Sequence, residues 1–288
     1  MAEDGEEATL LAVELPASLG GEVFRVNTSL GPLNVTVCGD RARPPMLTMH
    51  DVGTNHVGAF HSLLLCAGPK STISKTFCFY HVDAPGHQDG ADSVPQEARK
   101  MTLESLAEAL GQVASHFELR EALFLGVGAG ATALALLAAA QPRLCAGLVL
   151  VGPCVRKPGW WEWTYGKVAL NALAFIGLGH ATESFLLARM FGTNALELIN
   201  QGGDRSQAFK RDLHRIPNAA TQAYLSAALS RRDLRDAVPK IKCRTLLVLG
   251  EESMFYGTLV TEEMPQDVIG PLEAFLQHLQ LEGLCQPL

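Results

Sequence analysis

Short apolar runs recur along the chain, and most of them end in glycine, proline or an acidic residue. In chain order they are PPMLTMHDVG, TFCFYHVDAPG, EALFLGVGAG, CAGLVLVGP and CRTLLVLGEES. Segments with the helical spacing of apolar residues lie between most of them. Strands that alternate with helices predict a mostly parallel sheet, because a parallel crossover needs a helix between neighbouring strands. We therefore predict an α/β fold.

Two segments carry specific local signals. The strand-like pieces EVFRVNT and LNVTVCG are joined by the turn SLGP, which predicts a hairpin at a sheet edge. Thr102 is predicted to cap a helix whose apolar face is formed by Leu103, Leu106, Leu110 and Val113.

Strand signals stop between Pro153 and about Arg235, where the apolar spacing is helical. A helical insertion in a parallel sheet covers the strand ends, where such sheets bind their ligands. We predict an acidic disordered tail at 1–12, a core at 13–153, a helical cap at 154–236 and the rest of the core at 237–288.

The run that ends at residue 127 continues as a glycine-rich turn, LGVGAGA, followed by a helical segment. Strand, tight turn and helix are typical of the nucleophile elbow of an α/β-hydrolase, whose pattern is G-x-S-x-G. Gly126 and Gly130 take the two glycine positions, but Gly128 stands where the serine would be. Glycine accepts the positive φ of such a turn and offers no nucleophile. The sequence therefore predicts a degenerate elbow.

The same glycines allow two other interpretations. Gly126, Gly128 and Ala131 also fit the dinucleotide-binding pattern G-x-G-x-x-A, but that site needs an acid about twenty residues further on. No Asp or Glu occurs between Glu121 and Glu162. Alternatively, the glycines only permit close packing of helix on strand, which again implies no nucleophile. We predict no cofactor.

Partners for a catalytic serine are also difficult to find. Glu251 and Glu252 follow a strand-like run where a hydrolase acid could lie, although such residues also suit a solvated loop. His278 is the one histidine near the C-terminus, and it flanks the apolar face of a predicted helix. A hydrolase would then need an unrecognised nucleophile such as Ser93 or Cys154, which we interpret as loop and core residues.

Polar residues follow two of the strand-like runs. His50 and Asp51 could line the crevice as an oxyanion-like loop, although we favour a plain polar loop at the strand end. The next run supplies Asp83, a third candidate for the crevice lining. Its neighbours suggest a metal set of His81, Asp83, His87 and Asp89. Because Pro85 and Gly86 turn the chain between them, we predict no metal site.

The cap carries three tryptophans in close succession, Trp160, Trp161 and Trp163. We expect them to anchor the cap to the core, and a partner-binding patch is the alternative.

Charge and cysteine content narrow the class of protein. A net charge of -7 argues against nucleic acid as a partner, since phosphate binding needs a basic face. Seven cysteines without a C-x-x-C pair suit buried, reduced thiols in a cytoplasmic protein. The uncharged segment 122–140 could span a bilayer, but its glycines favour a strand that turns into a helix.

Several segments together resemble the N-myc downstream-regulated (NDRG) family, and closely its plant-type branch. They are LTMHDVGTNH, FYHVDAPGHQDGA, GVGAGA, GLVLVGP, WWEWTYGKV, LSRRDL and LVTEEMPQ, and the resemblance covers nearly the whole chain from about residue 13. It implies an α/β-hydrolase fold with a helical cap, no catalytic triad and a signalling or adaptor role in growth, stress response or trafficking. It also implies protein partners, with heterotrimeric G-protein βγ subunits as candidates. We expect at most peripheral membrane association.

One departure from the family pattern lies near the C-terminus. The family places a helix and a further core strand between LLVLGE and the segment G-x-x-V-T-E-E, whereas here EESMFYGTLVTEEMPQ follows directly. We therefore expect the sheet to be shortened there, with the usual place of a catalytic histidine removed.

Overall fold

The computed structural model describes residues 20–68, 71–191, 204–250 and 265–281. The predicted tail at 1–12 and the candidate acids Glu251 and Glu252 lie outside these ranges. So does most of the segment where a helix and a strand were predicted to be missing.

The described strands form one sheet of 7 strands in the order β1-β2-β4-β3-β5-β6-β7. Antiparallel pairing joins β1 to β2 and β2 to β4, and every other neighbouring pair is parallel. The predicted edge hairpin and mostly parallel sheet are confirmed. The strand bounds are β1 Glu22–Thr28, β2 Gly31–Cys38, β3 Pro45–Met49, β4 Cys78–Val82, β5 Ala122–Val127, β6 Cys145–Val151 and β7 Arg244–Val248.

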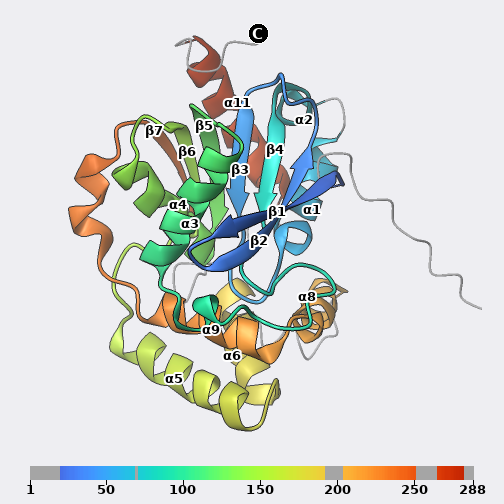
Figure 1. The fold of residues 1–288 in the computed structure, drawn as a ribbon, viewed down its shortest axis with the longest axis vertical. Coiled ribbons are helices and arrows are strands. Elements are labelled where there is room, and N and C mark those ends of the chain that lie inside the picture. Colours follow the sequence, from blue (N-terminus) through green and yellow to red (C-terminus); the bar gives the residue numbers. More distant parts are fainter. Residues whose placement is uncertain (1–19, 69–70, 192–203, 251–264, 282–288) are drawn as a thin grey trace, which may run out of the picture.

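Helices cover both faces of this sheet (Figure 1). Every residue of β4, β5 and β6 is buried, which explains why these strands read as continuous apolar runs rather than alternating ones. The helices that flank the sheet are α1 His56–Ala67, α2 Thr72–Thr76, α3 Leu103–His116, α4 Gly128–Ala140 and α11 Pro265–Leu281. This layered arrangement is the predicted α/β-hydrolase architecture.

Local capping fixes the start of α3 as predicted. The Thr102 hydroxyl accepts a hydrogen bond from the Ser105 backbone N–H at 3.1 Å, and the Thr102 N–H donates to the Ser105 hydroxyl at 2.9 Å. This reciprocal pair satisfies backbone donors that the first helical turn leaves unpaired.

Four described helices lie between β6 and β7 in the chain and pack beyond the carboxyl ends of the parallel strands (Figure 1). They are α5 Trp160–Phe175, α6 His180–Phe191, α8 Asp204–Arg215 and α9 Asn218–Leu229. Short 3-10 turns complete the described elements: η1 Glu97–Lys100, η2 Leu234–Asp236 and η3 Val238–Lys240. Among the helices in the described ranges, none is long and apolar enough to cross a membrane.

The prediction that the tryptophans anchor the cap is wrong. Trp160, Trp161 and Trp163 are 67 %, 63 % and 48 % exposed on α5. The face of α5 that packs inward instead consists of Glu162, Gly166, Ala169, Leu170 and Leu173. Small and aliphatic side chains let α5 approach the neighbouring helices closely, and the indoles are left outside.

Candidate functional site

The glycine-rich turn lies where β5 ends and α4 begins. Gly128 has a φ of 57°, in the left-handed region that favours glycine. A Cβ at Gly126 would overlap the backbone of Ala131, and a Cβ at Gly130 would overlap the His50 carbonyl oxygen. Close helix packing therefore requires the two outer glycines, while the turn itself requires the middle one.

The carboxylate of Asp51 occupies the space in front of this turn. A Cβ built on Gly128 would overlap both the carboxyl carbon and the oxygens of Asp51. The Ala129 backbone N–H, which follows the elbow position, donates to Asp51 Oδ1 at 2.8 Å. In α/β-hydrolases the N–H after the nucleophile helps to bind the reacting oxyanion. Here a side-chain carboxylate of the protein itself binds that donor.

Arg189 of α6 reaches the same carboxylate from the cap. Its Nη2 lies 3.3 Å from Asp51 Oδ1 and 3.4 Å from the Cys154 sulfur, and all three side chains are buried. Burial alone would lower the pKa of Arg189, but the nearby Asp51 carboxylate raises it above its usual range, with help from Cys154 and Glu162. The guanidinium is therefore held charged beside Asp51.

A second buried ion pair continues the first. Arg231 donates from Nη1 and Nη2 to the two carboxylate oxygens of Glu162, at 2.8 and 2.7 Å. Arg189 Nη1 lies 3.6 Å from Glu162 Oε1. Four buried side chains therefore form a row of alternating charge, in the order Asp51, Arg189, Glu162 and Arg231. The sequence did not predict that Arg189, Glu162 and Arg231 form buried ion pairs here. The available signal was Glu162, an isolated acid in an otherwise apolar helical segment.

His50 is a neutral structural residue in this arrangement. The Ala84 N–H donates to His50 Nε2 at 2.9 Å, so the proton is on Nδ1, which donates to the Asp51 carbonyl oxygen at 2.7 Å. Burial lowers its pKa, although Asp83 acts in the opposite direction. Both ring nitrogens are thus used to hold two loops together, and the lone pair that a general base would need is occupied.

Asp83 supports the start of α1. Its Oδ1 accepts from the backbone N–H of His56 at 2.9 Å and lies 2.9 Å from the His56 Nδ1. Burial raises the pKa of Asp83, but the neighbouring His56 and its hydrogen bonds lower it further, and the net pKa is below the usual value. The His50 ring lies farther away, with Nε2 at 3.9 Å.

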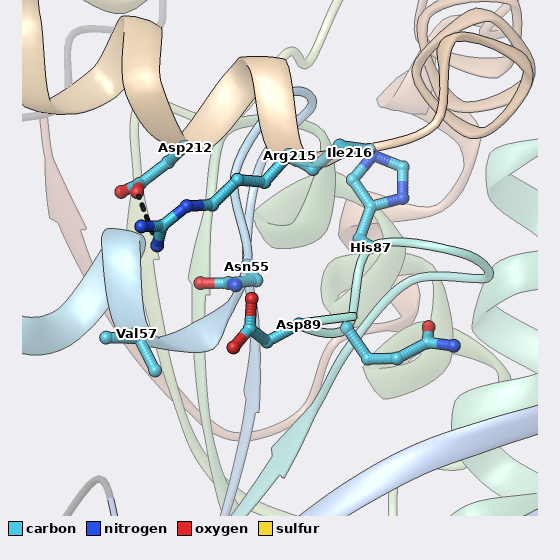
Figure 2. Close-up of a pocket in the computed structure, with 8 residues that line it drawn as sticks. Asn55, Val57, His87, Asp89, Asp212, Arg215 and Ile216 are labelled. Carbon is cyan, nitrogen blue, oxygen red and sulfur yellow. Dashed lines mark ion pairs between the residues drawn. The ribbon is translucent and has the colours of Figure 1, made fainter. Parts of the chain in front are cut away.

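A small pocket lies between the core loops and α8 (Figure 2). Its volume is about 160 Å³, and it is lined by Asn55, Val57, His87, Gln88, Asp89, Asp212, Arg215 and Ile216. Neither Gly128 nor Asp51 lines it. The His87 Nδ1 faces the Pro85 carbonyl oxygen at 3.2 Å, and burial lowers the pKa of His87 to about 3. His87 is therefore a second neutral histidine.

The remaining predicted candidates lie in different parts of the fold. Ser93 is exposed in the loop after β4 and lines a different pocket. His278 is exposed on α11, beside the buried Leu276 and Leu279 as predicted. Cys154 is buried beside Arg189, the same side chain that contacts Asp51. Within the described ranges, no three His, Cys, Asp or Glu side chains are grouped to hold a metal ion.

Comparison with known proteins gives the family. The model of the Ndr family matches residues 23–268. The chain belongs to the Ndr family. It is 33% identical to Protein NDL1 of Arabidopsis thaliana over 93% of this chain and 84% of that protein. It is also 32% identical to Protein NDRG3 of Xenopus tropicalis, over 81% of this chain and 60% of that protein.

Solved structures similar to this Ndr-family chain are α/β-hydrolases. A hydrolase from Pseudomonas aeruginosa PA01 matches with a TM-score of 0.71 and 22% identity, over 89% of this chain and 98% of that one. The enol-lactonase from Burkholderia xenovorans LB400 matches with a TM-score of 0.67 and 17% identity, over 85% and 96% of the two chains. At these identities the likeness shows the fold alone. The NDRG resemblance and the α/β-hydrolase fold predicted from the sequence are confirmed.

Proposed function

We propose that this Ndr-family chain is a catalytically inactive α/β-hydrolase-fold protein that acts as a signalling or adaptor protein through its surfaces. One observation carries the proposal. The Asp51 carboxylate lies in the space that a nucleophile at position 128 would need, and it accepts the Ala129 N–H that would stabilise an oxyanion.

Electrostatics supports this proposal. Acyl transfer builds negative charge on the substrate oxygen, and enzymes lower that barrier with donors aimed at the developing charge. A substrate oxygen that develops negative charge beside the Ala129 N–H would be repelled by the negative charge of the Asp51 carboxylate. Moving that carboxylate away would also leave Arg189 buried with a weaker partner, which is strongly unfavourable.

The alternative function is that of an esterase-like hydrolase with another nucleophile. Cys154 is the candidate that a specific observation favours, because its sulfur lies 3.4 Å from Arg189 Nη2 in the crevice. A cation can stabilise a thiolate. Against this alternative, the Cys154 side chain is buried, and the nearby His50 uses both ring nitrogens for other hydrogen bonds.

Turnover and active-site labelling distinguish the two functions. We expect the purified full chain to hydrolyse short acyl esters no faster than a heat-denatured sample, and to show no stoichiometric labelling by serine- or thiol-directed acylating probes at residue 154. Cys154→Ser is the matched control for any thiol labelling. Turnover well above background that is lost in Cys154→Ser would refute the proposal and support the alternative.

Protein partners are the second part of the proposal. The family resemblance makes heterotrimeric G-protein βγ subunits the first candidates, so a pull-down with the purified full chain and βγ subunits is the direct measurement. A saturable complex would support the adaptor role. Absence of binding at micromolar concentrations would exclude βγ subunits as the partner.

A further inference from the structure

Helix α5 carries apolar side chains on both of its faces. The inner face, with Leu170 and Leu173, packs into the cap. The outer face is exposed and presents an aromatic stripe, which we define as Trp160, Trp161, Tyr165, Val168, Phe175 and Ile176. A helix that is apolar all round normally has both faces covered. The exposed outer face of α5 is therefore a candidate docking surface.

The stripe is long and exposed. From residue 160 to 175 it spans about 23 Å at the rise of an α-helix. Phe175 and Ile176, at its end, are 85 % and 84 % exposed. With aromatic side chains of about 150–250 Å² each, the stripe exposes on the order of 500 Å², comparable with the largest apolar patch of a typical monomer. Trp160 and Trp161 contact each other, and Trp161 stacks on Tyr165.

Charges along α5 oppose the net charge of the chain. The exposed charged residues at 155–176 are Arg156, Lys157 and Lys167, and the acid in that stretch, Glu162, is buried against Arg231. The whole chain nevertheless carries a net charge of -7. A face with this composition attracts an anionic surface and repels a second copy of itself.

A cationic pocket lies beside the stripe, between α5, α9 and η1. Its volume is about 420 Å³, and its polar lining consists of Arg99, Lys167, Asn171, Gln222 and Ser226. No Asp or Glu is among the described residues that line it. Two cations, two amides and a hydroxyl form a donor-rich setting for a phosphate group. Lys167 also lies over the Trp163 ring, 5.9 Å from its centroid, which links the pocket to the aromatic residues.

We propose that the outer face of α5 docks onto a bilayer that contains anionic phospholipid. The aromatic stripe enters the interfacial region, and the cationic pocket receives a lipid phosphate. Trp and Tyr favour this depth because their rings are apolar and their tips are polar. Helix α5 lies at the opposite end of the molecule from α2 and α11 (Figure 1), and its stripe residues are exposed.

Sedimentation of the full chain with vesicles tests this proposal. We expect binding to vesicles of phosphatidylcholine with phosphatidylserine, weak binding to phosphatidylcholine alone, and a blue shift of the tryptophan emission on binding. The stripe variant Phe175→Asp/Ile176→Asp and the pocket variant Arg99→Glu/Lys167→Glu should each bind more than about tenfold more weakly. Two controls introduce the same acidic residues elsewhere on the surface, Val23→Asp on β1 and Lys75→Glu on α2, and should bind like the wild type.

Three outcomes would overturn the proposal. One is no binding of the wild type to the anionic vesicles at low salt. Another is equal loss of binding in the control variants. The third is a wild-type dimer in light scattering that the stripe variant dissociates, without vesicle binding, because a second copy would then cover α5. If inorganic phosphate binds the wild type and the stripe variant equally and vesicles bind neither, the pocket takes a soluble anion instead. The assay reads no turnover, so its result is independent of whether the elbow is catalytic.

Discussion

The Asp51 carboxylate and the α-carbon of Gly128 are so close that no side chain fits between them. Asp51 follows β3 and Gly128 follows β5, and these strands are parallel neighbours in the sheet. The loop after β3 therefore places the Asp51 carboxylate against the glycine turn that follows β5. A serine at position 128 would displace the Asp51 carboxylate. The glycine at 128 and the position of Asp51 therefore depend on each other.

Gly128→Ala should destabilise the protein for two separable reasons. The left-handed backbone disfavours alanine by about 1 kcal/mol, and overlap with Asp51 adds about 1–3 kcal/mol of overpacking. Urea unfolding measures the sum. Gly90→Ala is the matched control, because Gly90 has a φ of 70° and nothing within 4 Å of its Cβ position. It should show the backbone contribution alone.

A double-mutant cycle isolates the overlap itself. In the Asp51→Ala background, Gly128→Ala should cost about as much as Gly90→Ala does, because the carboxylate is gone. An equal effect of Gly128→Ala in both backgrounds would contradict the steric relationship between Asp51 and residue 128.

Removal of Arg189 should be severely destabilising. Arg189→Met leaves the Asp51 carboxylate buried with the Ala129 N–H as its remaining described donor, and breaking a buried pair costs about 3–5 kcal/mol. The free energy of unfolding in urea measures the loss. Glu22→Gln, which removes the exposed Arg41–Glu22 pair at 3.4 Å, is the control and should give no resolvable change. A similarly small effect of Arg189→Met would mean that the cap does not hold Asp51.

Local features could be predicted from the sequence, and contacts between distant segments could not. The hairpin, the Thr102 cap and the glycine turn each depend on a few adjacent residues, so their sequence signals are sufficient. The Arg189–Asp51 contact joins residues 138 positions apart and depends on where the cap rests. For α5 the sequence was ambiguous, because apolar residues surround the helix and their spacing does not say which face is packed. Spacing alone therefore does not place the tryptophans, and the prediction that they anchor the cap is wrong.

Two buried neutral histidines predict how stability depends on pH. Burial lowers the pKa of both His50 and His87 from 6.5, to about 3 for His87. In the unfolded chain each histidine takes up a proton as the pH falls through 6.5, whereas in the folded chain each does so at a lower pH, about 3 for His87. Their contribution to stability is therefore complete above pH 6.5 and is lost as the pH falls, and for His87 the loss is about 1.4 kcal/mol per pH unit.

Replacement of His87 should reduce that slope. His87→Asn keeps a donor near the Pro85 carbonyl but does not titrate, so the slope of unfolding free energy between pH 4.5 and 5.5 should fall by about 1.4 kcal/mol per pH unit. Leu63→Ala removes a buried side chain that does not titrate. It should lower stability equally at every pH, by about 2–5 kcal/mol. An unchanged slope in His87→Asn would mean that His87 is not neutral in the fold.

The thiols of Cys145 and Cys243 should form a disulfide under mild oxidation. Their sulfurs are 3.3 Å apart; Cys145 is the first residue of β6, and Cys243 immediately precedes the neighbouring strand β7. The hydrogen bond between them raises the pKa of Cys145, with burial adding to the effect, and lowers the pKa of Cys243. Cys243 is also the less buried of the two, so its thiolate is the expected nucleophile.

Diamide supplies the required oxidant: the two thiols lose two hydrogens to it and become joined through their sulfurs. Peptide mapping by mass spectrometry should then find the 145–243 linkage, and Cys243→Ser should abolish it. Cys66→Ser is the control, because Cys66 is exposed on α1 and should leave the linkage intact. If the major linkage joined other cysteines in the wild type, the placement of Cys243 beside the start of β6 would be wrong. The edge of the sheet at β7 would then be placed differently from the fold described above.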